Sequence, residues 1–288
     1  MAPLQSGFAI VTPASRGLGF ALAQHLLAHT NLPVVATARA DYHGVRDQLL
    51  KKLKHASDAD KRLSVFQVDV TDESSISKMA SEIRALYPDT LLRLAITLPG
   101  VLHVEKSPAQ IDVHHALESF KVNALGQMLL MKHLSPFLPG KSSPPFEDTQ
   151  QSSKVNRLPR YLPLHATYAM MAARVGSISD NASGGWYSYR ASKAAVFQLA
   201  KTFDLYLQSR SKERAMAIAM HPGTVQTDFT RNYWSKRAMF QPEESAASLV
   251  EVLCTLGSGA NEGRGRCWDW KGQETGCGRV QRPPAFGE

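Results

Sequence analysis

Short apolar runs rich in β-branched residues alternate with longer segments of helical periodicity along this chain. The predicted strands are Phe8–Thr12, Pro33–Ala38, Leu63–Asp69, Leu91–Thr97, Ala215–His221 and Arg266–Trp270. The predicted helices are Leu18–His29, Tyr42–Lys54, Glu73–Leu86, Gln110–Phe137 and Tyr189–Ser209. Apolar strands separated by helices are typical of a parallel sheet that is covered on both faces. We therefore predict an α/β fold with one doubly wound parallel sheet and helices on both faces.

The composition fits one globular domain over residues 1–288. Hydrophobic residues make up 43% of the chain, and 33 Lys and Arg against 25 Asp and Glu leave a net charge of +8. The basic residues are scattered, and the cluster Lys51, Lys52 and Lys54 lies on the solvated face of a predicted helix. No nucleic-acid-binding motif accompanies them, so we expect no nucleic acid partner. The positive balance does suit an anionic ligand.

The number and spacing of the cysteines, together with the hydropathy of the chain, indicate the cellular compartment of the protein. Cys254, Cys267 and Cys277 are odd in number and are not spaced like zinc ligands, which predicts free thiols, no metal site and a reducing compartment. The chain start has no basic segment followed by an apolar run, and no apolar stretch reaches about 18 residues. These features predict no signal peptide, no membrane association and a cytoplasmic location.

The segment Leu138–Pro163 breaks the alternation because it is rich in Pro, Ser and charge and has neither helical nor strand periodicity. We interpret it as a long surface excursion between a helix and the next strand. A boundary between two domains at this point is the less favoured alternative.

The first predicted strand runs directly into a glycine-containing turn, TPASRGLG, which precedes a predicted helix. Glycines in such a turn let the backbone approach a pyrophosphate, whose charge then lies at the helix N-terminus. A tight turn without a ligand would share this pattern, but another strand about 20 residues further on favours a dinucleotide site and a Rossmann-like sheet. The candidate residues are Thr12, Ser15, Arg16, Gly17, Leu18 and Gly19.

The end of the second predicted strand indicates which dinucleotide would bind. Arg39 stands where an NAD-binding fold would carry an acidic residue on the ribose hydroxyls. A guanidinium there fits a 2′-phosphate, and Arg16 in the turn adds a second cation. Asp41 is the contrary residue. We predict NADP(H).

The sequence YRASK places a phenol, Tyr189, and an ammonium, Lys193, one helical turn apart. Residues at i and i+4 share a helix face, so the two groups can project into one site. An isolated pair of this kind is usually a surface contact. In a catalytic site, the nearby positive charge would favour the phenolate and make Tyr189 a usable acid and base.

Together with the glycine turn, this pair makes the sequence resemble the short-chain dehydrogenase/reductases over nearly the whole chain. Further motifs are similar to those of the family: Asp69-Val70, FKVNALG with Asn123, GSISDNASGGWYSYRASKAAV and HPGTVQTD. The last two, with WDWKGQE near the C-terminus, resemble a C-factor-like branch of that family.

The resemblance implies a role for each matched residue. Tyr189 would exchange the proton with the substrate oxygen, Lys193 would lower the pKa of Tyr189 and hold the ribose, and Asn123 would anchor the water of a proton relay. The phosphates and adenosine would be held by the residues of the glycine turn, Arg39, Asp69 and Val70. Residues near the nicotinamide would be Leu98, Gly100, Pro222, Gly223, Val225 and Thr227.

The sequence departs from the family pattern at three places. Pro13 replaces the first glycine of the turn and removes one N–H donor. The segment Thr97–Gly100 replaces the family's Asn-Asn-Ala-Gly. Ala173 aligns with the catalytic Ser, although a second alignment places Ser177 there. Without the Ser hydroxyl, one hydrogen-bond donor to the substrate oxygen is missing, which costs roughly 10²–10³ in rate in other enzymes.

We therefore predict an NADP(H)-dependent oxidoreductase that transfers hydride between the nicotinamide and a small carbonyl or alcohol substrate. The alternative is an NADP-binding relative without efficient hydride transfer, such as a cyclase, an isomerase or a regulatory binder. A pure interaction protein would require an empty nucleotide turn. The aromatic and basic segment 229–240 is the predicted substrate lid. A homodimer and a monomer are both compatible with the sequence.

Overall fold

The protein is described by a computed structural model that covers residues 6–51, 53, 58–147, 162–233 and 239–275. Its centre is a seven-stranded sheet in which all neighbouring strands are parallel, in the order β3-β2-β1-β4-β5-β6-β7. The strands are β1 Phe8–Thr12, β2 Val34–Ala38, β3 Leu63–Gln67, β4 Leu92–Thr97, β5 Ala166–Met171, β6 Ala215–His221 and β7 Cys267–Asp269. The predicted doubly wound parallel sheet is confirmed.

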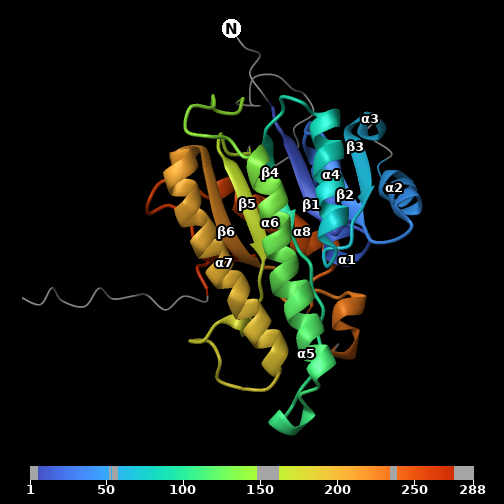
Figure 1. Cartoon of the computed structure of the whole chain (residues 1–288), viewed down its shortest axis with the longest axis vertical. Coiled ribbons are helices and arrows are strands. Elements are labelled where there is room, and N and C mark those ends of the chain that lie inside the picture. Colours follow the sequence, from blue (N-terminus) through green and yellow to red (C-terminus); the bar gives the residue numbers. More distant parts are fainter. Residues whose placement is uncertain (1–5, 52, 54–57, 148–161, 234–238, 276–288) are drawn as a thin grey trace, which may run out of the picture.

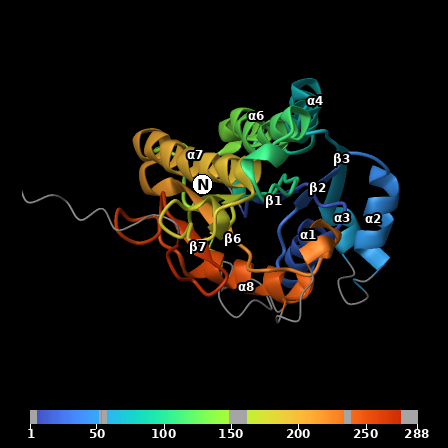
Figure 2. The ribbon, with the colours of Figure 1, turned by 90° about the horizontal axis from the view of Figure 1, so that it is seen from below.

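Helices cover both faces of this sheet (Figures 1 and 2). One face carries α4 (Glu73–Leu86), α5 (Val113–Phe120), α6 (Gly126–Leu134) and α7 (Tyr187–Ser211). The other face carries α1 (Gly17–His29), α2 (Tyr42–Lys51), α3 (Ala59–Arg62) and α8 (Pro242–Thr255). None of the helices in the described part of the chain has the length and apolarity to cross a membrane.

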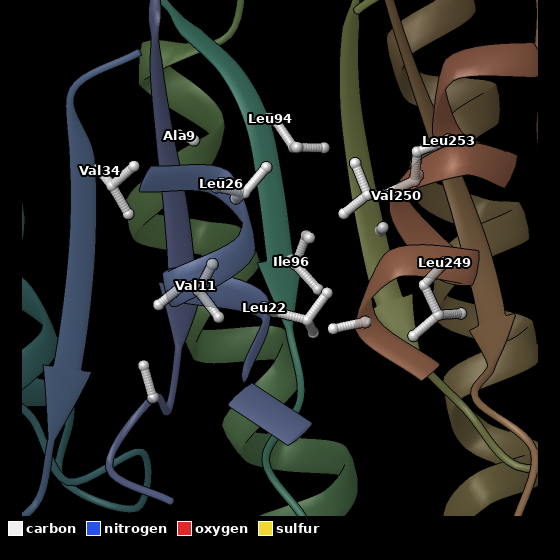
Figure 3. Packing of buried hydrophobic residues seen from close by; sticks show 14 of the residues in the cluster. Ala9, Val11, Leu22, Leu26, Val34, Leu94, Ile96, Leu249, Val250 and Leu253 are labelled. Atoms are coloured by element: carbon white, nitrogen blue, oxygen red, sulfur yellow. The ribbon is translucent and has the colours of Figure 1, made fainter. Parts of the chain in front are cut away.

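Alternate side chains of each strand enter two separate cores. On one face, Val11 and Ile96 of the sheet pack against Leu22 and Leu26 of α1 and Leu249 of α8 (Figure 3). The other face forms its own buried cluster with α4, α6 and α7. Because a strand directs successive side chains to opposite faces, a sheet buried on both sides needs apolar residues throughout. This requirement explains the apolar strand runs in the sequence.

Several element boundaries differ from prediction. The helix predicted over Gln110–Phe137 begins later, at Val113, where Asp112 accepts hydrogen bonds from the His114 and His115 N–H groups. The chain then passes through a π-helical turn at Lys121–Leu125 before α6. Asp112 is an N-cap, and the side-chain pattern that placed the helix start at Gln110 did not include this interaction.

Two helices, α3 and α8, were not predicted from the sequence, and β5 was expected only as the strand after the excursion, without bounds. The start of α8 carries a capping box between Gln241 and Glu244, with Pro242 in the first turn. The predicted excursion, residues 138–163, lies mostly outside the described residues. Its described beginning is packed, since Leu138 and Phe146 are buried in the core beside α7.

All parallel strands end at the same edge of the sheet, and the loops that follow them meet there. The strand order reverses between β1 and β4, with β2 on one side and β5 on the other. In open α/β sheets, ligands bind in the crevice outside the carboxyl ends of the strands at such a switch point. The predicted site residues lie on the loops after β1, β2, β3, β4 and β6, and on the helices beside this edge.

Candidate active site

The glycine turn after β1 folds tightly because two of its positions have no room for a side chain. A Cβ on Gly19 would lie 2.1 Å from the Pro13 carbonyl oxygen and 3.1 Å from Leu98 Cδ1. Gly17 has a φ of +55°, and a Cβ there would meet Thr227 Cγ2 at 3.2 Å. The turn therefore packs against Leu98 in the loop after β4 and against Thr227 in the loop after β6. Its first residue, Thr12, is anchored to β2 through its hydroxyl, 2.7 Å from that of Thr37.

Two guanidinium groups stand free beside this turn. Arg16 is the N-cap residue of α1, and Arg39 follows β2; both are exposed. Among the described residues, neither side chain has a hydrogen-bond or ion-pair partner. The contrary residue Asp41 is occupied, because its Oδ1 accepts a hydrogen bond from the Gly44 N–H at 3.1 Å in the first turn of α2. Ser15 and Leu18 flank Arg16 and are partly exposed.

Asp69 and Val70 form the loop after β3. Burial raises the pKa of Asp69, but hydrogen bonds from the Thr71 N–H and hydroxyl, with the charges of Arg39 and Lys121, outweigh burial and bring the pKa below its usual value. Val70 packs against the start of α6, where a Cβ on Gly126 would approach it to 3.2 Å. Asp69 is therefore an ionised acceptor on the side of the turn where Arg39 lies.

Asn123 lies in the π-helical turn between α5 and α6 and is completely buried. Its Oδ1 accepts from the Val101 N–H at 2.7 Å, and its Nδ2 donates to the Val101 carbonyl at 3.0 Å and to Ser192 Oγ at 2.9 Å. Ser192 Oγ in turn donates to the Tyr189 carbonyl at 2.9 Å. Asn123 thus joins the loop after β4 to the helix that carries the Tyr–Lys pair. Such π-helical turns are frequent at functional sites.

Tyr189 lies in the first turn of α7, with its ring between two other aromatic rings. The ring centroid of Trp186 is 6.1 Å away, nearly perpendicular, and that of Phe229 is also 6.1 Å away. Burial raises the pKa of the Tyr189 phenol well above its usual value. Within the described residues, the hydroxyl has no hydrogen-bond partner, so it is available to a bound molecule and is protonated at neutral pH.

Lys193 faces the same site one turn further along α7. Its Nζ donates to the Met171 carbonyl at 3.0 Å and lies 5.9 Å from the centroid of the Tyr189 ring. Burial lowers its pKa to about 8. Gly100 lies beside Lys193, Asn123 and Phe229. A Cβ on Gly100 would lie 3.7 Å from Lys193 Nζ, 3.9 Å from Asn123 Oδ1 and 3.6 Å from Phe229.

The loop after β6 closes the site on the side of the predicted nicotinamide segment. Gly223 has a φ of +78°, and a Cβ there would lie 2.9 Å from Trp270 and 3.0 Å from Phe240. Pro222 is held by a hydrogen bond from Ser245 Oγ to its carbonyl at 2.8 Å. Val225 is buried, forms a β-bridge with Phe240, and accepts a hydrogen bond from Thr230 Oγ1 at its carbonyl. Thr227 lies against Gly17, as described above.

The predicted lid, 229–240, is described only in part. A short 3-10 helix at Asp228–Tyr233 places Phe229 against Tyr189, and Phe240 pairs with Val225. Residues 234–238 lie outside the described residues. Phe229 is 41% exposed, and its ring is tilted by 52° against the Tyr189 ring.

Ala173 lies two residues beyond the end of β5, where it caps a 3-10 turn at Arg174–Gly176. A Cβ on Gly176 would lie 2.7 Å from the Lys193 carbonyl carbon, so this turn lies directly on α7. The other candidate, Ser177, is buried, and its hydroxyl is 3.1 Å from Ser179 Oγ and accepts from the Asp180 N–H. The Ser177 hydroxyl is thus bonded within its own loop.

Two further residues at the site were missed by sequence reasoning. Ser192 links Asn123 to Tyr189, as described above. Glu105, in the loop after β4, is buried and binds the start of α7 through Ser188. No local signal could have identified Glu105, since its partner is 83 residues away in the chain.

The chain is similar in sequence and fold to several known proteins. The sequence profile of a family described as short chain dehydrogenase matches residues 7–144. The chain is 27% identical to 1-hydroxy-2-glutathionyl-2-methyl-3-butene dehydrogenase of Rhodococcus sp. strain AD45 over 191 residues, which cover 66% of this chain and 70% of the relative. It is also 27% identical to C-signal of Myxococcus xanthus over 164 residues, covering 57% and 80% of the two chains.

Among solved structures, an NADPH-bound carbonyl reductase from chicken fatty liver has a similar fold. The TM-score is 0.75 at 26% identity, and the match covers 95% of this chain and 100% of the other. The narrower likeness to a C-factor-like branch stays a prediction.

Proposed function

We propose that this chain belongs to the short-chain dehydrogenase/reductase family and is an NADP(H)-dependent oxidoreductase that acts on a carbonyl or alcohol substrate, with Tyr189 as the proton donor and acceptor. The observation that carries this proposal is that Lys193 and Asn123 meet at Gly100 while the Tyr189 ring centroid lies 5.9 Å from Lys193 Nζ, at the edge of the sheet where the glycine turn lies. The proteins similar to this chain include a dehydrogenase and a carbonyl reductase, which supports the reaction class.

The residues present fit a dinucleotide phosphate. The glycine turn leads into the N-terminus of α1, which is a favourable position for a pyrophosphate. Arg16 and Arg39 would bind the 2′-phosphate, because both guanidiniums are exposed and free of other partners among the described residues. The NADPH of the chicken reductase supports the same choice. When bound, the nicotinamide supplies or accepts the hydride.

The chain's own residues handle the proton. In the reducing direction, Tyr189 Oη donates its proton to the substrate oxygen while the substrate carbon receives hydride. The raised pKa keeps the phenol protonated for this step. Lys193, whose pKa is about 8, carries positive charge at neutral pH and stabilises the phenolate that results. Asn123 holds the loop after β4 and, through Ser192, the backbone at Tyr189.

A second candidate function rests on Ala173. If this residue occupies the position of the family's Ser, the substrate oxygen loses one donor, and Ser177 is engaged in its own loop. The chain would then bind NADP(H) and transfer hydride poorly, as a non-redox enzyme or a regulatory binder. The intact Tyr189–Lys193 pair favours the first function.

The test is NADPH oxidation over a panel of carbonyl substrates, with wild type, Tyr189→Phe and Ala173→Ser measured side by side. NADPH affinity is measured separately by fluorescence. We expect wild-type turnover, a loss of about 10³-fold or more in kcat for Tyr189→Phe because the proton donor is removed, and unchanged NADPH affinity. Ala173→Ser should raise kcat about tenfold or more by restoring a donor.

Turnover in Ala173→Ser alone would instead support the non-redox function. Turnover that survives Tyr189→Phe would overturn the role of the phenol. A wild type that binds no NADPH would exclude both functions and leave the interaction protein.

A further inference from the structure

We propose that Glu105 is a positioning residue, which fixes the first turn of α7 and thereby sets the place of Tyr189. Glu105 comes from the loop after β4, and Tyr189 lies in the N-terminal turn of α7. The proposal rests on the function proposed above only in its kinetic consequence. The contact itself is a property of the fold.

Glu105 binds the helix start at three points. One carboxylate oxygen accepts from the Ser188 N–H at 2.8 Å, and the other accepts from the Ser188 hydroxyl. Its backbone carbonyl accepts from the Trp186 N–H at 2.6 Å. With its side chain and its main chain, Glu105 therefore holds two of the three residues that precede Tyr189.

The first turn of α7 has no cap of its own. The N-cap residue, Trp186, is in the left-handed region with a φ of +52° and makes no capping hydrogen bond with its side chain. The two residues before it, Gly184 and Gly185, also have positive φ. The first N–H groups of a helix need acceptors from outside it. Glu105 supplies an acceptor for Ser188, and its negative charge lies at the positive end of the helix dipole.

Apart from these hydrogen bonds, no described cation balances the charge of the Glu105 carboxylate. Its side chain is 2% exposed, and it forms no ion pair with any described Lys, Arg or His. Burying a carboxylate without a cation is unfavourable unless hydrogen bonds compensate. Here the compensation comes from the helix that carries Tyr189.

The loop after β4 thus holds the site from two sides. Val101 binds Asn123, which reaches the Tyr189 carbonyl through Ser192, while Glu105 binds the residue immediately before Tyr189. The backbone on both sides of Tyr189 is tied to a single loop. A shift of about 1 Å in a reacting group can cost about 10²-fold in rate, so this tie has a kinetic consequence.

The chain contains a matched control. In α4, Asp72 accepts from the Ser74 N–H at 2.9 Å and from the Ser74 hydroxyl at 2.7 Å, which are the same two kinds of hydrogen bond at the same helix position. None of the catalytic residues lies on α4. Asp72→Ala therefore removes a comparable helix cap without touching the residues around Tyr189.

The experiment compares Glu105→Ala, Glu105→Gln and Asp72→Ala with wild type by kcat at saturating NADPH, by NADPH affinity and by amide hydrogen exchange of the first turn of α7. Glu105→Ala should lower kcat about 10- to 100-fold, change NADPH affinity less than about threefold, and speed exchange at Ser188 and Tyr189. Glu105→Gln should recover most of kcat, because its amide can accept from the Ser188 N–H and donate to the hydroxyl. Asp72→Ala should leave kcat within about twofold.

Equal loss of kcat in Glu105→Ala and Asp72→Ala would overturn the proposal, since both would then act through general destabilisation. Unchanged kcat in Glu105→Ala would also overturn it. If the wild type turned over no carbonyl, the proposed reductase function would fail, and hydrogen exchange would decide the inference. Unchanged exchange at Ser188 in Glu105→Ala would refute the anchoring, and faster exchange would support it.

Discussion

The two halves of the site are held together in different ways. The half that would bind the dinucleotide phosphate centres on the glycine turn, with Arg16 and Arg39 exposed at its surface. The half around Tyr189 is buried and depends on contacts between segments 69 to 83 residues apart, from Asn123 to Ser192 and from Glu105 to Ser188. The first half offers free charge to a ligand, and the second fixes a reacting group in place.

This difference follows from what each half must do. A phosphate is bound by charge and by backbone N–H groups at a helix start, which tolerate movement of long side chains. Proton transfer requires a hydroxyl held to within a fraction of an ångström, which burial and hydrogen bonds provide. A substitution in one half should therefore leave the structure and the function of the other half unchanged. The predictions below test that separation.

The largest effect is expected on the stability of the fold, at Gly19 in the glycine turn. In Gly19→Ala, the new methyl would lie 2.1 Å from the Pro13 carbonyl oxygen, so the turn must shift, and we expect a loss of about 3 kcal/mol or more in the free energy of unfolding. Gly100→Ala is the matched comparison, because its nearest neighbours lie at 3.6 to 3.9 Å, which is ordinary contact. It should fold normally but weaken NADPH binding about tenfold by filling space at the site.

Urea denaturation and NADPH titration of both variants check this contrast. If Gly100→Ala bound NADPH as wild type does, Gly100 would not border the cofactor. If Gly19→Ala were as stable as wild type, the close approach at Pro13 would not constrain the turn.

The next effect concerns the charge buried in the catalytic half. Folding lowers the pKa of Lys193 from 10.5 to about 8. Between these pH values the unfolded chain binds a proton at this lysine that the folded chain does not, so the free energy of unfolding rises with pH through this window. Lys193→Met lacks this contribution. Its stability relative to wild type should therefore decline by about 2–3 kcal/mol between pH 8 and pH 10.

Denaturation curves for both proteins at several pH values provide the measurement. Arg39→Met, which removes an exposed cation from the other half, is the control, and its difference from wild type should not vary with pH. A constant difference for Lys193→Met would mean that the ammonium is solvated in the folded protein.

The two halves also differ in how far the sequence could predict them. The strand runs, the glycine turn and the Tyr189–Lys193 spacing are local patterns, and they predicted the parallel sheet and brought the right segments to one edge. The anchoring of α7 by Glu105 and the link through Ser192 depend on partners that only the folded chain brings close. Local periodicity contains no information about such pairs.

A smaller effect is expected in the cofactor half. Arg39→Ala removes an exposed guanidinium that would bind a 2′-phosphate, and a hydrogen bond to a charged group contributes about 1.5–3 kcal/mol. NADPH affinity should therefore fall about 10- to 100-fold, with NADH affinity changed less than about threefold. Titration of both cofactors at two salt concentrations checks this, because a charge contact weakens as salt increases. An equal loss for NADPH and NADH would show that Arg39 does not recognise the phosphate.

The smallest effect is predicted for Asp41, the residue that argues for NAD in the sequence. Its carboxylate oxygen caps α2 through the Gly44 N–H, so Asp41→Ala should cost about 1 kcal/mol of stability and leave the ratio of NADPH to NADH affinity within about twofold. Asp41→Asn is the control, because Asn keeps the accepting oxygen and tolerates the φ of +46° at this position. It should keep wild-type stability although the charge is gone. If either variant shifted the ratio tenfold toward NADPH, the carboxylate would face the ribose rather than the helix, and the separation between a capped helix start and a free phosphate site would not hold.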